Sequence, residues 1–311
     1  MKIKNNLSKI IIALTLLLLF AVTISFSGCS ATKFHDDDLA YVFGEVFGKK
    51  PRNVTPEDLE TVESFSIMNY ADNNTVTVTL SGYVETLESE GREAAATYVR
   101  TVDITDMTIS EMEDFAYLKN LKSFAALYSS LQSFEFLTLC PELREVEISA
   151  AYNCTDFSYL SSIEKLEKLF ITDCQVSDIS FVSQMKNLTD LTLSGTYKDG
   201  YPLHDISFLE DMTSLKSLSL SSLGITDISP LANLKNLESL NLAYNGISDV
   251  TPISELYDLK FINLTQNLIE DLSSLKNYNP DTFGRIILDL NSLIKDWTPL
   301  DYLGNKVQGR H

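Results

Sequence analysis

Apolar residues recur along this chain at steps that fit neither a single helix nor a single strand. In residues 237–267 they fall at Leu237, Leu240, Leu242, Ile247, Val250, Ile253 and Leu256, and the series begins again at Leu259. The alternation of Leu240 and Leu242 predicts a short strand with one buried face. The three-residue steps that follow predict a tight 3₁₀-type return. The sequence therefore contains a repeated unit that runs from Leu237 to the residue before Leu259.

The unit can be followed in both directions along the chain. Successive units begin at near-constant spacing, at Val99, Leu121, Leu143, Leu166, Leu188, Leu215, Leu237 and Leu259. A looser first unit begins at Val62, and a last one begins near Arg285 with Leu288 and Leu290. One coil cannot bury its apolar residues alone, but stacked coils bury them against each other and form a parallel sheet. Each buried Leu or Ile contributes ~1.5–3 kcal/mol.

This pattern resembles the leucine-rich repeat family, in the 22-residue class that includes bacterial internalins. The segment ITDISPLANLKNLESLNLAYNGISDVTPI carries the resemblance most closely, and the resemblance spans roughly residues 35–303. It implies an α/β fold: a right-handed solenoid with a parallel concave β-sheet, a 3₁₀ or irregular convex side and a helical N-terminal cap.

The segment before the repeats fits such a cap. Apolar residues at Leu39, Val42, Phe43, Val46 and Phe47 predict an amphipathic helix that Gly48 ends. The acids at 36–38 predict the start of that helix. The stretch HDDD also suggests a metal site, but the helix start is the favoured interpretation. Residues 55–58, TPED, predict a second helix start. Alternating Val76, Val78 and Leu80 predict an inserted hairpin within residues 71–98.

The N-terminal segment 1–28 has the pattern of a secretory signal. Three lysines precede the apolar run 10–26, whose length is at the short limit for spanning a bilayer and leaves an uncleaved membrane anchor as the alternative. Phe26-Ser27-Gly28-Cys29 resembles the lipobox of bacterial lipoproteins, which implies lipidation of Cys29; the alternative is a plain signal peptide before an unmodified cysteine. The predicted location is the bacterial cell envelope, with the chain anchored to the outer face of a membrane. The predicted organisation is signal peptide 1–28, linker and cap 29–61, solenoid 62–303 and tail 304–311.

The net charge limits the class of partner, and the positions of the cysteines predict their state. The net charge of −19 becomes −22 once Lys2, Lys4 and Lys9 are removed, which argues against a nucleic-acid partner. Three further cysteines occupy inward or asparagine-type positions of the repeat, and we expect them to be buried and reduced, a disulfide being the alternative. They are Cys140, Cys154 and Cys174.

The middle residue of each strand should point outward onto the concave sheet, where we expect no side chain to serve the fold. Together with the residues two places after each strand and a few aromatic neighbours, these positions form the candidate binding face. Its candidate ligand-binding residues are Tyr128, Glu147, Phe170, Asn241, Tyr244, Phe261 and Asn263. Exposed aromatics are common interface anchors, although isolated ones are also ordinary surface.

The sheet face alone offers roughly 500 Å², less than the ~800 Å² per partner of a standard interface. A protein partner would therefore also contact the rims. The coil with five extra residues, SGTYKDGYPLHDI, predicts a protruding loop that carries the remaining candidates Tyr197 and Tyr201, with Lys198 and Asp199.

The sequence shows no motif for catalysis, no cofactor motif and no metal-ligand spacing. It predicts a membrane-anchored recognition or adhesion module that binds a protein, with a glycan as the second choice. The alternative is a structural or accessory subunit of a cell-surface assembly. The residues GNKVQGRH after Leu303 form no evident cap for the open sheet edge, so we expect either that this tail covers the edge poorly or that another molecule covers it.

Overall fold

The computed structural model describes residues 32–70, 73–80, 98–104, 109, 112–176, 178–195 and 204–310. The predicted signal peptide, Cys29 and the loop with Tyr197, Lys198, Asp199 and Tyr201 lie outside these residues. No helix within the described ranges has the length and apolar character needed to cross a membrane.

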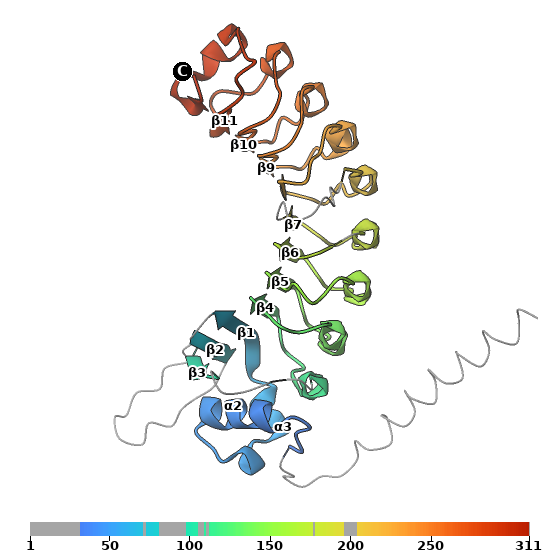
Figure 1. The fold of residues 1–311 in the computed structure, drawn as a ribbon, viewed down its shortest axis with the longest axis vertical. Helices are drawn as coiled ribbons and strands as arrows, with labels where there is room; N and C mark the ends of the chain where they lie inside the picture. Colours follow the sequence, from blue (N-terminus) through green and yellow to red (C-terminus); the bar gives the residue numbers. More distant parts are fainter. Residues whose placement is uncertain are drawn as a thin grey trace, which may run out of the picture.

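The described chain is a curved solenoid built on one sheet. Its twelve strands follow the order β12-β11-β10-β9-β8-β7-β6-β5-β4-β1-β2-β3. The pairings from β1 through β4 to β12 are parallel, and those of β2 with β1 and β3 are antiparallel. Strands line the inner side of the curve and 3₁₀ helices its outer side (Figure 1). The predicted leucine-rich repeat solenoid is confirmed.

One short 3₁₀ helix belongs to the coil of β1 and to each coil from β4 to β11, whereas β2 and β3 form the inserted hairpin and β12 belongs to the C-terminal tail. The strands are β1 Val62–Tyr70, β2 Asn73–Leu80, β3 Tyr98–Asp103, β4 Ser123–Leu127, β5 Glu145–Ser149, β6 Lys168–Thr172, β7 Asp190–Ser194, β8 Ser217–Ser221, β9 Ser239–Asn241, β10 Phe261–Asn263, β11 Arg285–Ile287 and β12 Val307–Gln308. The 3₁₀ helices of the coils are η2 Glu113–Tyr117, η3 Glu135–Leu139, η4 Ser158–Ser162, η5 Ser180–Gln184, η6 Ser207–Leu209, η7 Ser229–Asn233, η8 Thr251–Ile253, η9 Ser273–Leu275 and η10 Thr298–Lys306.

The N-terminal cap forms as its sequence predicts. Helix α2 spans Asp37–Phe47; the Asp36 carboxylate accepts a 2.8 Å hydrogen bond from the Leu39 amide, and Gly48 ends the helix at φ 62°. After the 3₁₀ turn η1 (Pro51–Asn53), α3 (Pro56–Leu59) begins with a capping box between Thr55 and Asp58. These local bonds satisfy amides that a helix start leaves without partners.

The prediction that a coil begins at Val99 is wrong. Residues 98–103 form β3, which pairs antiparallel with β2 at the edge of the sheet, while β1 pairs directly with β4. Val99 is 57% exposed instead of occupying an inward position. A period-two strand pattern looks the same in a hairpin and in a coil, so spacing alone did not separate the two. The hairpin itself was predicted, and Val76, Val78 and Leu80 are buried in β2.

The predicted register of the last coil is also wrong. Ile262 pairs with Ile286, so the inward residues of this coil are Ile286 and Leu288 instead of Leu288 and Leu290. Leu290 is 67% exposed and takes the left-handed position that follows each strand, with φ 63°. The alternation of Ile286, Leu288 and Leu290 fits two registers, and the prediction took the later one. The middle residue of this strand is therefore Ile287, and Leu290 takes the position two places after the inward residue Leu288.

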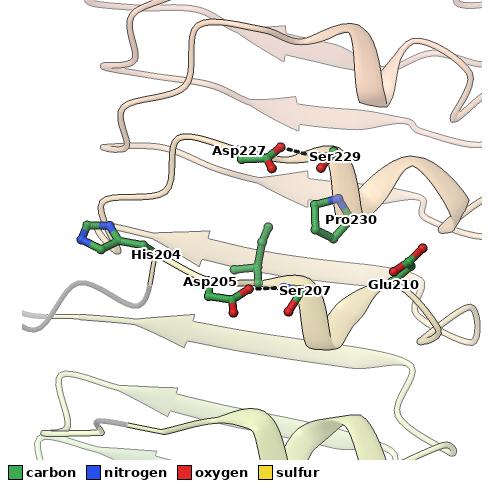
Figure 2. A pocket seen from close by; sticks show the side chains of 8 residues that line it. His204, Asp205, Ser207, Glu210, Asp227, Ser229 and Pro230 are labelled. Carbon is green, nitrogen blue, oxygen red and sulfur yellow. Dashed lines mark hydrogen bonds between the residues drawn. The ribbon is translucent and has the colours of Figure 1, made fainter.

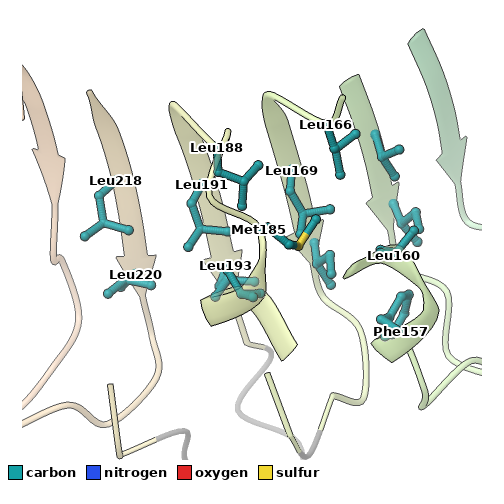
Figure 3. Close-up of a cluster of buried hydrophobic side chains, with 14 of the residues drawn as sticks. Phe157, Leu160, Leu166, Leu169, Met185, Leu188, Leu191, Leu193, Leu218 and Leu220 are labelled. Atoms are coloured by element: carbon teal, nitrogen blue, oxygen red, sulfur yellow. The ribbon is translucent and has the colours of Figure 1, made fainter. Parts of the chain in front are cut away.

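The core is a continuous stack of aliphatic and aromatic side chains. Figure 3 shows leucines of neighbouring coils aligned above one another, such as Leu169, Leu191 and Leu218. At the N-terminal end phenylalanine rings continue the stack from the cap into the coils, for example Phe43 on Phe65 and Phe65 on Phe124, with centroids 6.1 and 6.2 Å apart. The cap therefore covers the first coil by direct ring packing.

Buried asparagines tie the C-terminal coils together. The Asn267 amide nitrogen donates to the carbonyls of Leu242 (2.9 Å) and Leu264 (3.1 Å), and its oxygen accepts from the Ile247 amide (3.0 Å). Asn245 and Asn291 occupy the same place in their coils. These bonds satisfy backbone groups that the turn after each strand would otherwise leave buried without partners.

The three cysteines among the described residues are free thiols. Cys140 and Cys154 are buried, whereas Cys174, at the asparagine position, is only half-buried. The expectation that all three are buried is therefore wrong for Cys174. Burial raises the pKa of the Cys140 thiol to about 12 and that of Cys174 to about 11. Both thiols therefore stay protonated near neutral pH and are poor nucleophiles.

The C-terminal residues cover part of the last coil, as in the first of the two expected alternatives. The two residues of β12 pair with β11, and the Leu288 amide donates to the Gln308 carbonyl at 3.0 Å. The Lys306 ammonium donates to the Phe283 carbonyl at 2.6 Å. Gly309 has φ 108° and lies so close to Leu288 that a Cβ would be 2.7 Å from its carbonyl carbon. A short tail thus closes this end through backbone bonds.

Candidate functional site

The inner face of the solenoid carries the candidate residues. Strand register aligns the middle residues of β5 to β10 into one row, because Glu147 pairs with Phe170, Phe170 with Thr192, and Asn241 with Asn263. Side chains alternate along each strand, so these residues point away from the buried leucines. The row is therefore a surface of the sheet, on the concave side in Figure 1.

Charged and aromatic side chains gather in the middle of this face. Glu147 is exposed and Phe170 half-buried beside it. At the strand starts Lys168 and Glu145 form an ion pair of 3.5 Å, and both are partly exposed. Such exposed pairs add ~0–1 kcal/mol to stability. This pair therefore adds little to stability and stays accessible to a partner.

Two tyrosines stand at the edge of the same face. Tyr128 and Tyr244 are 47% and 49% exposed, and both lie just after a strand in the left-handed conformation. The Tyr244 amide donates to the Thr265 carbonyl of the next coil at 2.8 Å. This bond fixes the backbone, so each ring projects from a constrained position. Rigid aromatic side chains lose little entropy on binding.

Two candidates serve the fold. The Asn241 side chain accepts from the Ala243 amide (3.2 Å) and donates to the Ser219 hydroxyl (3.0 Å). The Asn263 oxygen accepts from the amide (3.0 Å) and the hydroxyl (2.7 Å) of Thr265. The expectation that no outward side chain has a structural role is therefore wrong for both asparagines. They shape the turn after the strand, as asparagine often does.

The face changes character along its length. Beyond Phe170 the outward strand positions of β8 and β9 hold small uncharged side chains: Ser217, Ser219, Ser221, Ser239 and Asn241. Phe261 opens β10, half-buried between Ser239 and Arg285 on the neighbouring strands. Aromatic residues therefore border a stretch that offers hydroxyl and amide groups.

The sequence did not single out Ile287, Leu290 or Leu268. The two leucines are more than half exposed, and Leu290 occupies the same position after its strand as Tyr244. The register error at β11 hid Ile287 and Leu290. Leu268 follows the buried Asn267, and no periodic signal marks it.

A separate depression lies outside the sheet face, between η6 and η7 (Figure 2). His204, Asp205, Glu210 and Asp227 line it. Asp205 and Asp227 accept hydrogen bonds from the amides of Ser207 (2.9 Å) and Ser229 (2.8 Å), which lower the pKa of each carboxyl. Both acids therefore belong to helix-start turns.

No group of three or more His, Cys, Asp or Glu within the described part of the chain could hold a metal ion. His35 contacts Asp114, its Nδ1 lying 2.8 Å from Oδ1, at the junction of cap and first coil. His204 Nδ1 lies 2.9 Å from the Gly224 carbonyl. The acids of the HDDD stretch also act locally, since Asp36 caps α2.

Comparisons with known proteins agree with this architecture. Residues 235–277 match the family model described as Leucine Rich repeats (2 copies). The chain is similar to the crystal structure of internalin C2 from Listeria monocytogenes, with 22% identity and a TM-score of 0.60, over 85% of this chain and 100% of that one. It is also similar to internalin F of the same organism, with 22% identity and a TM-score of 0.58, over 89% of this chain and 82% of that one. No curated protein matches the sequence. The predicted internalin-like fold is confirmed.

Proposed function

We propose, from the premise that this chain is a leucine-rich repeat protein with an internalin-like fold, that it is a membrane-anchored recognition module of the bacterial envelope. Its partner is a protein, bound on the concave face. The observation that carries this proposal is the row Glu147, Phe170 and Thr192, whose side chains face outward at the centre of the sheet. The tyrosines at 128 and 244 add anchoring rings at the edge.

The anchor is supported by the sequence of the N-terminal segment. The apolar run 10–26 and the Phe26-Ser27-Gly28-Cys29 motif favour export followed by lipidation of Cys29. A diacylglycerol with a further acyl chain is enough for stable membrane attachment. Intact-mass measurement of the membrane-extracted protein tests this directly: the expected product begins at a lipid-modified Cys29. A chain that still begins at Met1, or an unmodified cysteine, would contradict lipidation.

Recognition on the concave face is tested by removing its aromatic side chains together. In the variant Phe170→Ser, Tyr244→Ser, Phe261→Ser, we expect at least a ten-fold loss of partner capture from cell surfaces, because buried aromatics dominate interface energies. The matched control replaces Tyr41, Leu139 and Tyr257, which are exposed apolar residues outside the sheet face. Capture that survives in the first variant and fails in the control would support the accessory-subunit alternative. Capture abolished by glycosidase treatment of the cells would indicate a glycan.

A further inference from the structure

A compact basic segment interrupts this acidic chain. Lys49-Lys50-Pro51-Arg52 is the one stretch of four residues in the sequence with three cations, in a chain of net charge −19. It joins the end of α2 to η1. Lys49 pairs with the Asp58 carboxylate at 2.6 Å, so its charge is offset within the cap. Lys50 and Arg52 are exposed.

The chain enters the fold beside this segment. The Thr32 amide donates to the Val54 carbonyl at 2.9 Å, close to Arg52 in the chain. The next residue, Lys33, is exposed. Lys33, Lys50 and Arg52, named here the anchor-side surface, have no carboxylate partner among the residues that the structure describes. Three exposed cations, without a carboxylate partner among the described residues, therefore lie within two residues in the chain of Thr32 or Val54 or, for Lys50, within four.

The proposed anchor lies very close to this point. Cys29 is three residues from Thr32, so the connection spans at most ~10 Å even when fully extended. An uncleaved apolar segment ending at Phe26 would add only three more residues. Either attachment holds the cap at the membrane, with the C-terminus at the opposite end of the solenoid (Figure 1).

We propose that the anchor-side surface is seated on anionic lipid headgroups, so that the solenoid stands on its N-terminal cap. This inference rests on the membrane anchoring proposed above. Each basic residue close to an anionic bilayer increases the equilibrium constant for contact with the bilayer roughly five-fold. This attraction extends only about a Debye length from the surface. The cap also carries the exposed acids Asp37, Glu45, Glu57 and Glu60, so attraction is confined to the three cations instead of spreading over the cap.

The orientation has a consequence for recognition. The remaining coils are acidic and are repelled by the same headgroups. From β1 through β4 to β12, nine strand spacings of ~4.8 Å place the last coil roughly 40 Å from the first. The concave face is then held upright, with Phe261 and Leu290 farthest from the bilayer.

Amine labelling of the anchored protein tests this orientation. The full chain, extracted from membranes, is reconstituted by its own anchor into vesicles of phosphatidylcholine alone or of equal parts phosphatidylcholine and phosphatidylglycerol. A water-soluble amine-reactive ester then modifies exposed lysines, and mass spectrometry reports each site. We expect Lys33 and Lys50 to react at least five-fold more slowly on the anionic vesicles at low salt. Lys216, Lys276 and Lys295, exposed in distant coils, serve as internal controls and should react equally on both.

Two further measurements test whether electrostatic attraction causes the protection. Protection should disappear at high salt, and the variant Arg52→Glu should restore labelling of Lys50. Equal labelling of Lys33 and Lys50 on both vesicles, for protein that floats with the lipid, would overturn this inference alone. Protein that does not float with either vesicle would overturn the anchor and this inference together.

Discussion

Among the residues that the structure describes, seven other than glycine hold a left-handed conformation at the same place after their strands, with φ between 53° and 63°. They are Tyr128, Ala150, Asp173, Ser222, Tyr244, Gln266 and Leu290. This conformation costs roughly 1–2 kcal/mol for a residue with a Cβ. The amide at this position bonds to the next coil, as Gln266 does to the Asp289 carbonyl at 2.8 Å. Inter-coil bonding therefore maintains a strained position that also projects Tyr128 and Tyr244.

Substitution of Gln266 measures that strain. Gln266→Gly should raise the free energy of unfolding by about 0.5–1 kcal/mol, because glycine adopts positive φ without a steric penalty. Gln266→Val should lower it by about 1–2 kcal/mol, because a β-branched side chain fits this region worst. Urea denaturation of the three proteins checks both values. Equal stability of the glycine and valine variants would show that the backbone is unstrained here.

The buried asparagine position gives a second prediction at this scale. Asn267→Ala removes the partners of the Ile247 amide and of the Leu242 and Leu264 carbonyls. We expect a loss of about 1–3 kcal/mol of unfolding free energy, the usual cost of leaving a buried polar group unpaired. Asn277→Ala, at an exposed site, is the control and should change stability by less than about 0.5 kcal/mol. An equal effect of the two substitutions would contradict the role given to Asn267.

At the scale of elements, one carboxylate joins the cap to the solenoid in addition to the packing of phenylalanine rings. Asp114, at the start of η2, is fully buried and accepts from the amides of His35 (2.8 Å) and Asp36 (3.2 Å) as well as facing the His35 ring. The neighbouring Glu113 is exposed. Because a buried donor without a partner is costly, this acid ties the start of α2 to the first 3₁₀ helix.

Removal of this tie should loosen the cap selectively. Asp114→Ala should cost about 1.5–3 kcal/mol, the usual value for hydrogen bonds to a charged group. We expect faster amide exchange over residues 35–47 and unchanged exchange in the coils after β5. Glu113→Ala is the control. Uniformly faster exchange throughout the solenoid would mean that Asp114 supports the whole fold instead of the joint.

The elements also show what the sequence could predict. Inward residues at a fixed spacing define the coils, and Asp36, Gly48 and Thr55 mark helix ends by local hydrogen bonds, so strands, returns and cap follow from the sequence. The direction and the register of strand pairing do not follow from the sequence in the same way. β3 has a strand pattern but pairs antiparallel with β2, and the alternation of Ile286, Leu288 and Leu290 fits two registers, of which the one adopted leaves Leu290 on the surface. Both errors arise because pairing depends on neighbours far along the chain.

The candidate site was predictable to a similar extent. Alternation alone places Glu147 and Phe170 on the outer side of the sheet. It could not show that Asn241 and Asn263 use their side-chain oxygens to hold the following turn, because that depends on the turn conformation.

At the scale of the whole molecule, seven aspartates repeat outside the sheet, each two positions before a serine or threonine. They are Asp156, Asp178, Asp205, Asp227, Asp249, Asp271 and Asp296. Hydrogen bonds from the following serine or threonine lower the pKa of every one below its ordinary value of 3.8. The folded state therefore favours the ionised acids along the length of the solenoid.

This arrangement predicts acid sensitivity. A carboxyl with a lowered folded pKa stabilises the fold above its unfolded pKa and loses that contribution as pH falls through the folded value. The free energy of unfolding should therefore decline below about pH 4. Asp227→Asn with Asp249→Asn should make this decline less steep, whereas Asp258→Asn, an exposed acid outside these turns, should leave it unchanged. Identical pH profiles for all three proteins would contradict the proposed linkage.

Site-specific photo-crosslinking in living cells tests most directly whether the concave face is the binding face. A photoreactive phenylalanine analogue replaces Phe170 or Tyr244 on the sheet side, and Leu139 or Tyr257 elsewhere. We expect a discrete crosslinked protein from the first two positions and none from the other two. Crosslinks that form from Leu139 and Tyr257, with none from Phe170 and Tyr244, would contradict recognition by this face.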